Sequence, residues 1–198
     1  MPARAEGRRM GWRMRAGPAD CPNGHHRGVS TSPFVIYFAY GSNMLWQRIR
    51  ARVPSARPLG SAILHGHQLA WHKSGRDGSG KCDVVPIAEA GHAVHGVLYE
   101  ILAAEKPALD LAEGLGVDYD EKQVEVETRN GPVTAWVYLA MRTDPTVQPY
   151  AWYKAIVLAG AREHGLPDDY VARLDAALAI DDPNAARHAA HIALTIDR

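Results

Sequence analysis

The segment from residue 123 to residue 140 constrains the fold of this chain most. QVEVET (123–128) alternates polar and apolar residues in strict period two, RNGP (129–132) has the composition of a turn, and VTAWVYLA (133–140) is a second apolar-rich run. Such alternation places every second side chain on one face of a sheet, and a short Gly-containing connection pairs two runs in antiparallel fashion. The segment therefore predicts a β-hairpin.

Apolar runs upstream predict further strands. FVIYFA (34–39) is short and rich in β-branched and aromatic residues, which favours a buried strand. Residues 59–72, 84–87 and 93–102 also have the composition of strands, and the glycine-rich residues 74–81 predict a loop.

Apolar residues recur at helical spacing in five segments, at residues 44–53, 103–116, 150–165, 169–180 and 185–194. Ser42 or Asn43 is placed to cap the first helix, and Pro54 to end it. Strands followed by helices predict an α+β fold, with a mixed, curled or closed, barrel-like β-sheet surrounded by α-helices.

Length and charge define the expected domains. A chain of 198 residues, 46% hydrophobic and 22% charged, is long enough for one packed core. We expect this domain at residues 33–180, followed by a C-terminal helical tail at 181–198. Residues 1–32 lack apolar periodicity and are rich in Gly, Pro and Arg, which predicts a disordered basic leader. Because the leader concentrates arginines and the overall formal charge is +0, the domain itself is mildly acidic.

This composition argues against several classes of protein. The domain lacks the basic stripe that nucleic-acid binding needs, and no stretch approaches the ~18 consecutive apolar residues of a membrane span, so we expect neither partner. Cys21 and Cys82 form no CxxC motif or disulfide framework, which fits a reducing, cytoplasmic location. His65 and His67, expected on one strand face, and His72 are candidate metal ligands, but no companion Cys or carboxylate completes a recognised spacing. We therefore expect no metal.

The turn Tyr40-Gly41-Ser42-Asn43 joins a predicted strand to a predicted helix. Successive backbone N–H groups and the helix dipole make such a turn a binding place for carboxylate or phosphate. An ordinary strand-to-helix connection is the alternative.

Glu113 lies at the end of a predicted helix, in LDLAEG (109–114). If Leu111 and Leu115 bury it, its carboxylate is suited to general-base work. The alternative is a solvated surface glutamate.

Three ordered blocks between about Val35 and Leu174 resemble the γ-glutamylcyclotransferase family. They are YFAYGSNM (37–44); VHGVLYEI (94–101) with LDLAEG, Tyr119 and the hairpin; and Tyr153 with Gly160-Ala161, Gly165-Leu166-Pro167 and Tyr170. The leader and the last helix have no counterpart in the family pattern.

The resemblance implies a mixed barrel with surrounding helices that converts a small γ-glutamyl amine to 5-oxoproline and the free amine. It implies Glu113 as the catalytic acid and base, Tyr153 as a substrate contact and Tyr119 as a further one. The γ-glutamyl site would be lined by Tyr37, Phe38, Ala39, Tyr40, Gly41, Ser42 and Asn43. It implies no cofactor and a monomer or homodimer.

This chemistry suits the residues. The α-amine of a γ-glutamyl substrate is already a nucleophile, so ring closure needs no Ser or Cys nucleophile, and Cys82 is expected to be a strand residue. One carboxylate can make both proton transfers. Backbone donors at Gly41 to Asn43 would hold the substrate α-carboxylate or a developing oxyanion. A noncatalytic small-molecule or metal-binding protein on the same fold is the alternative.

Overall fold

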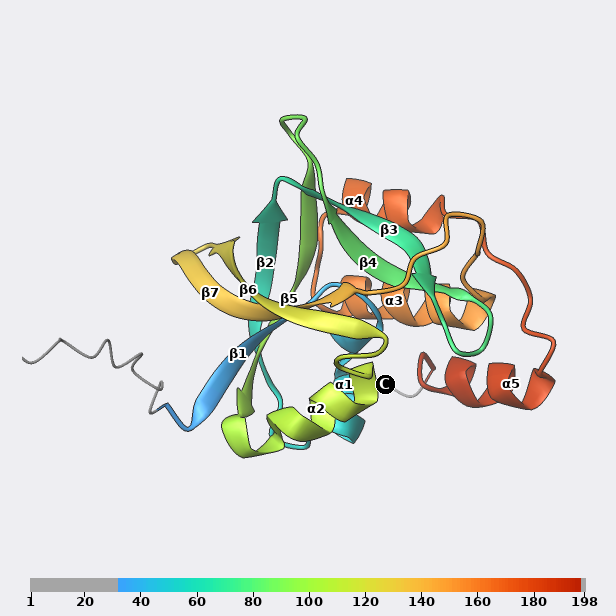
Figure 1. The fold of residues 1–198 in the computed structure, drawn as a ribbon, viewed down its shortest axis with the longest axis horizontal. Helices are drawn as coiled ribbons and strands as arrows, with labels where there is room; N and C mark the ends of the chain where they lie inside the picture. Colours follow the sequence, from blue (N-terminus) through green and yellow to red (C-terminus); the bar gives the residue numbers. More distant parts are fainter. Residues whose placement is uncertain (1–31, 197–198) are drawn as a thin grey trace, which may run out of the picture. The chain divides into compact units, whose positions relative to one another are not determined.

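The computed structural model describes residues 32–196 (Figure 1). Of the predicted leader at residues 1–32, only Ser32 is among the described residues. The predicted tail at residues 181–198 is described as far as residue 196. The elements are β1 (Phe34–Ala39), the 3-10 helix η1 (Ser42–Met44), α1 (Trp46–Arg52), β2 (Arg57–His65), β3 (His67–Ser74), β4 (Gly80–Pro86), β5 (Ala93–Leu102), the 3-10 helix η2 (Ala103–Glu105), α2 (Lys106–Glu113), β6 (Tyr119–Thr128), β7 (Gly131–Ala140), α3 (Ala151–Glu163), α4 (Asp168–Asp175) and α5 (Ala185–Ala193).

Five strands close into a barrel in the order β1-β5-β2-β6-β7. β1 pairs antiparallel with β5 and parallel with β7, where Tyr37 lies beside Trp136. That parallel contact makes the closed sheet mixed, and helices pack around it (Figure 1). The predicted α+β fold with a closed, barrel-like sheet is therefore confirmed.

The predicted hairpin is present as β6 and β7, which pair antiparallel with Val126 opposite Val133. Gly131 begins β7 with a φ of 106°, a backbone conformation that glycine adopts without steric cost. β6 starts at Tyr119, four residues before the predicted strand, because the ladder continues to the pair Tyr119 and Ala140. This extension brings Tyr119 to the end of the barrel where the site lies.

The stretch at residues 59–72 is two strands that belong to different sheets. The chain reverses at Gly66, whose φ is 67°, so β2 stays in the barrel while β3 pairs with β4 in a separate two-stranded sheet. His65 and His67 therefore lie on different strands, contrary to the expectation that they share one strand face.

The helix after β1 begins at Trp46, and neither Ser42 nor Asn43 caps it. Both residues belong to η1, and Glu163 Oε2 instead accepts from the Trp46 amide at 3.0 Å. The predicted cap is wrong because the side chains of Ser42 and Asn43 bind other groups, as described below.

Helix α3 packs directly on η1 at Gly160. A Cβ there would lie 2.5 Å from the Leu45 backbone nitrogen, so a side chain at this position would push the helix away. The close approach fixes η1 against a rigid support.

The helix predicted at residues 169–180 ends at Asp175. The chain that follows hydrogen-bonds to the start of α3, with the Ile180 amide donating to Pro149 O at 3.0 Å and Ile180 O accepting from the Ala151 amide at 2.9 Å. These hydrogen bonds hold Ile180 beside the start of α3, so the chain cannot continue as α4 to residue 180. In the described part of the chain, no helix is both long and apolar enough to cross a membrane.

Candidate active site

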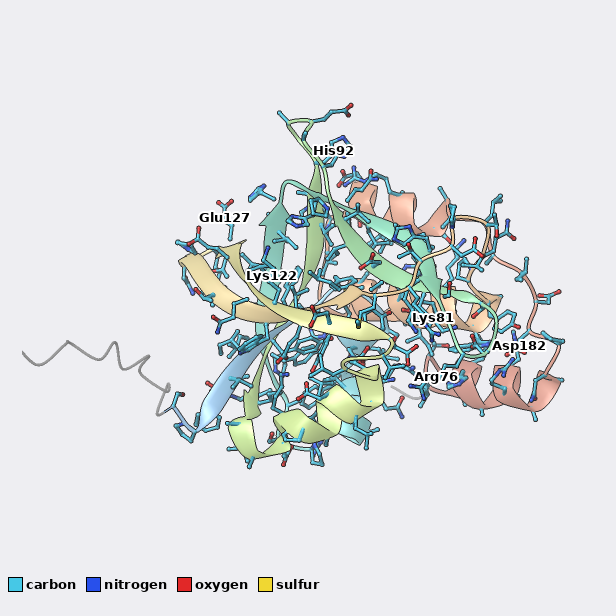
Figure 2. The ribbon with its side chains drawn as sticks, in the orientation of Figure 1. Arg76, Lys81, His92, Lys122, Glu127 and Asp182 are labelled. Carbon is cyan, nitrogen blue, oxygen red and sulfur yellow. The ribbon has the colours of Figure 1, made fainter. Side chains whose placement is uncertain are left out.

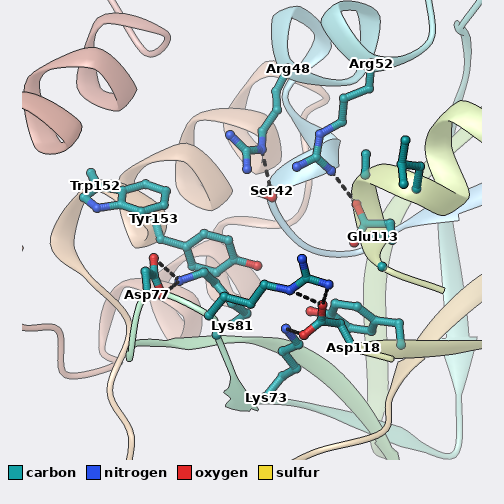
Figure 3. A pocket seen from close by; sticks show the side chains of 16 residues that line it. Ser42, Arg48, Arg52, Lys73, Asp77, Lys81, Glu113, Asp118, Trp152 and Tyr153 are labelled. Atoms are coloured by element: carbon teal, nitrogen blue, oxygen red, sulfur yellow. Dashed lines mark hydrogen bonds and ion pairs between the residues drawn. The ribbon is translucent and has the colours of Figure 1, made fainter. Parts of the chain in front are cut away.

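Two adjoining pockets lie where the turn after β1 meets α2, β4 and α3. The inner pocket has a volume of about 30 Å³, and the outer pocket one of about 300 Å³. Both are lined by Ser42, Glu113, Tyr119 and Tyr153, which therefore mark the junction between them. Figure 3 shows the outer pocket.

Most of the residues proposed from the sequence meet at the inner pocket. It is lined by Tyr37, Tyr40, Gly41, Ser42, Asn43, Glu113, Tyr119 and Tyr153, together with Cys82 and Tyr138. Phe38 and Ala39 line neither pocket and have no exposed surface. Successive strand residues face opposite sides, so Phe38 points away from Tyr37 and packs against Gly96.

Glu113 is the carboxylate at the junction. Its Oε1 accepts from Asn43 Nδ2 at 2.8 Å. The same oxygen accepts from Arg52, a contact that Figure 3 shows. Within residues 32–196 no donor binds Oε2, so this oxygen is free to exchange a proton with a substrate. Leu111 is 84% exposed and does not bury the glutamate, contrary to the condition set from the sequence. The reason is that α2 presents Leu111 to the outside, while Asn43 and Arg52 hold the carboxylate instead.

Asn43 fixes the geometry around Glu113. Besides binding Glu113, its Nδ2 donates to the Tyr37 hydroxyl oxygen at 3.0 Å, and its Oδ1 accepts from Arg52 at 2.8 Å. The residue is buried, so its amide has little freedom to turn. One side chain thus positions the carboxylate, a tyrosine and an arginine together.

Tyrosine hydroxyls form much of the inner wall. Burial raises the pKa values of Tyr37, Tyr119 and Tyr153 well above that of a free tyrosine, so these hydroxyls stay protonated. Tyr119 donates to Cys82 O at 3.0 Å, and the Tyr153 oxygen accepts from the Cys82 amide at 3.1 Å. Among the described residues, the hydroxyl proton of Tyr37 has no acceptor, and that of Tyr153 has only the weakly accepting Cys82 sulfur, so both can donate to a ligand.

The turn adds backbone donors to the same wall. Across residues 32–196, the amides of Gly41, Ser42 and Asn43 make no hydrogen bond to a protein acceptor. A Cβ on Gly41 would lie 3.1 Å from Cys82 Cβ and 3.3 Å from the Tyr153 hydroxyl oxygen, so a side chain here would crowd the pocket. The inner pocket is therefore rich in donors, which suits an anionic oxygen.

Cys82 lies on β4 with 1% of its surface exposed. Burial raises the pKa of its thiol to about 12, so the reactive thiolate is scarce at neutral pH. This agrees with the prediction that Cys82 is a strand residue rather than a nucleophile.

Charged side chains surround the outer pocket, and apart from Glu113 none of them was proposed as a site residue from the sequence. The cations are Arg48, Arg52, Lys73, Arg76 and Lys81, and the anions are Asp77, Glu113 and Asp118. Cations therefore outnumber anions. The four-residue spacing of Arg48 and Arg52 on a helix that follows the turn is the signal that could have identified them.

The three candidate metal ligands bind different groups. His65 lies 2.5 Å from Glu127 and His72 lies 2.9 Å from Asp83, while His67 contacts the His65 carbonyl oxygen at 2.8 Å. Glu127 is far from Arg76 and Lys81 of the outer pocket (Figure 2). No group of three metal-binding side chains converges anywhere in the part of the chain that the structure describes.

Comparisons with known proteins identify the family. Residues 93–174 match the model of the AIG2-like family. Mouse γ-glutamylcyclotransferase is 34% identical over 173 residues, covering 80% of this chain and 85% of the mouse protein, and the human enzyme is 34% identical over 150 residues, covering 71% and 77%. A solved structure of a γ-glutamyl cyclotransferase superposes with a TM-score of 0.72 at 29% identity, over 81% of this chain and 98% of that one. The chain therefore belongs to the γ-glutamylcyclotransferase family.

Proposed function

We propose that the protein is a γ-glutamylcyclotransferase, which converts a γ-glutamyl amino acid or a related small γ-glutamyl amine to 5-oxoproline and the free amine. The observation that carries this proposal is the state of Glu113. One carboxylate oxygen is held by Asn43 and Arg52, while the other is unoccupied at the edge of a pocket lined with hydrogen-bond donors.

The reaction begins with the α-ammonium group of the substrate. Glu113 Oε2 takes one proton from it, and the resulting amine attacks the γ-carbonyl carbon to close a five-membered ring. Holding both groups within one small pocket supports this step, because alignment of an intramolecular reaction can lower the barrier by roughly 7–11 kcal/mol.

Ring closure places a negative charge on the former carbonyl oxygen. The amides of Gly41 to Asn43 and the hydroxyls of Tyr37 and Tyr153 are donors suited to an anionic oxygen of the substrate. These protonated hydroxyls donate without ionising, because burial raises their pKa values.

Collapse of the intermediate completes the reaction. Glu113 delivers its proton to the leaving nitrogen as the bond between that nitrogen and the γ-carbon breaks, so the carboxylate is regenerated. The attacking nitrogen loses a second proton to solvent, and the released amine takes one up at neutral pH. The products are 5-oxoproline and the free ammonium form of the amine.

The test is product formation by the purified full chain. We expect 5-oxoproline, detected by mass spectrometry, from one or more members of a panel of γ-glutamyl dipeptides and glutathione. Calorimetry on the same panel provides the second readout. Binding without 5-oxoproline formation would instead support the noncatalytic binding protein, and the enzyme proposal would then be rejected.

A further inference from the structure

Arg48 is the cation of the outer pocket whose charge the described residues leave unmatched. Lys73 and Arg76 pair with Asp118 at 3.0 and 2.6 Å. Lys81 pairs with Asp77 at 2.9 Å, and Arg52 pairs with Glu113. Within residues 32–196, no carboxylate forms an ion pair with Arg48 (Figure 3).

The guanidinium of Arg48 is held in place but keeps donors free. Its Nε donates to Ser42 Oγ at 3.1 Å, which orients the side chain from α1 toward the junction of the two pockets. Among the described residues, its two terminal amino groups have no acceptor. Burial and the neighbouring Arg52 lower the pKa of Arg48 to about 10, so the group is still charged at neutral pH. A fixed guanidinium with a free pair of amino groups matches the two oxygens of a carboxylate.

The position of Arg48 indicates which substrate carboxylate it meets. Arg48 lines the outer pocket and not the inner one, whereas Ser42 and Glu113 line both. The bond that breaks must lie near Glu113, at the junction. With the γ-glutamyl part in the inner pocket, the departing amine extends into the outer pocket, on the side of Arg48.

We propose that Arg48 binds the carboxylate of the amino acid that the reaction releases, and so selects γ-glutamyl amino acids over γ-glutamyl amines that lack this carboxylate. The inference rests on the proposed function. It assigns a specificity-determining role to Arg48, while proton transfer stays with Glu113.

A matched pair of substrates isolates this carboxylate. γ-Glutamyl-L-alanine and γ-glutamylethylamide share the γ-glutamyl group and differ in the carboxylate on the departing amine. The wild-type chain should turn over both, with the higher kcat/KM on γ-glutamyl-L-alanine. The Arg48→Met variant should lose about 10- to 100-fold in kcat/KM on γ-glutamyl-L-alanine, the range for hydrogen bonds to a charged group, and change less than about 3-fold on the ethylamide.

Two further variants separate recognition from structure. Arg50→Met removes a cation from the same helix that is exposed and lies over the Trp46 ring, so the substrate preference should stay at the wild-type ratio. Arg48→Lys keeps the charge but not the paired donors and should recover part of the preference. Circular dichroism and thermal unfolding check that each variant folds.

The outcomes distinguish this inference from the function on which it rests. An equal loss on both substrates in Arg48→Met would mean that Arg48 binds the shared γ-glutamyl part or supports the fold, and would overturn the inference while the enzyme function stands. Equal kcat/KM of the wild-type chain on γ-glutamyl-L-alanine and γ-glutamylethylamide would also overturn the inference. If the wild-type protein forms no 5-oxoproline from these two substrates or from any member of the γ-glutamyl panel, both proposals are rejected together.

Discussion

The inner and outer pockets are lined by different kinds of chemical group. The inner pocket is lined by tyrosine hydroxyls, backbone amides and one carboxylate, supplied by barrel strands, the turn after β1, α2 and α3. Half of the residues that line the outer pocket are charged, and they come from α1, β3, the loop before β4, β4 itself, α2 and the turn after α2. The difference separates two tasks: uncharged donors of fixed position suit the reacting group, and longer charged side chains suit recognition of what varies between substrates.

The two regions also differ in how their side chains are held. In the inner pocket most side chains are fixed by hydrogen bonds to their neighbours, with Asn43 joined to Tyr37, Arg52 and Glu113. In the outer pocket, ion pairs such as the one between Lys81 and Asp77 restrain the ends of flexible chains. Substitutions in the inner pocket should therefore change turnover, and substitutions in the outer pocket should change substrate preference or stability.

The largest expected effect is that of Glu113→Gln. Glutamine keeps the size and hydrogen-bonding capacity of the side chain but cannot accept the proton, so kcat should fall by ~10²–10⁴ with little change in KM. Steady-state release of 5-oxoproline measures the effect. Glu125→Gln, at an exposed position on β6, is the matched control and should retain wild-type kcat. Near wild-type turnover in a folded Glu113→Gln protein would mean that another group moves the proton.

Asn43→Ala should have the next largest effect. It removes the donor that fixes Glu113 Oε1 and Tyr37, so kcat should fall by about 10- to 100-fold, corresponding to hydrogen bonds to a charged group. Because Asn43 acts through Glu113, the same change in the Glu113→Gln background should cost much less. Full additivity of the two substitutions in kcat would show that Asn43 does not act by positioning the carboxylate.

The sequence predicts the inner pocket well because its residues come from continuous strand, turn and helix signals. The turn at Tyr40 to Asn43 and the end of the helix at Glu113 are both local features, and the resemblance to a family joins them. Phe38 was included because it lies inside the motif, although the alternation of strand side chains could have excluded it.

The outer pocket is less accessible to sequence reasoning because tertiary structure assembles it. Lys73 and Asp118 meet at 3.0 Å only because β3 leaves the barrel at Gly66 and pairs with β4 as a second sheet. No local sequence pattern indicates that β3 leaves the barrel. The four-residue spacing of Arg48 and Arg52 was visible, but their partners, Ser42 and Glu113, become neighbours only in the folded chain.

The smallest expected effect concerns stability in the outer pocket and depends on pH. Burial of Asp118 opposes its ionisation, but the hydrogen bonds and charges of Lys73 and Arg76 outweigh this and lower its pKa. A carboxyl group with a lowered pKa in the folded state stabilises the fold above its ordinary pKa of about 3.9, and this contribution disappears as the pH falls through the folded-state value. The Asp118→Asn variant lacks the ionisable group, so its deficit in unfolding free energy should be largest near neutral pH and shrink as the pH falls below about 4.

Urea denaturation of wild type and Asp118→Asn across this pH range measures the difference directly. Asp120→Asn is the control, because Asp120 is exposed and accepts a hydrogen bond only from the adjacent Glu121 amide among the described residues. Its deficit in unfolding free energy should be small at every pH.

Turnover of the Asp118→Asn variant at neutral pH should stay close to that of wild type, since Asp118 lines only the outer pocket and not the inner one. If the deficit in unfolding free energy of Asp118→Asn stays constant across the pH range, the ion pairs of Asp118 do not stabilise the fold. If this variant loses much of its kcat, the outer pocket also takes part in turnover, and the separation of roles between the two pockets is wrong.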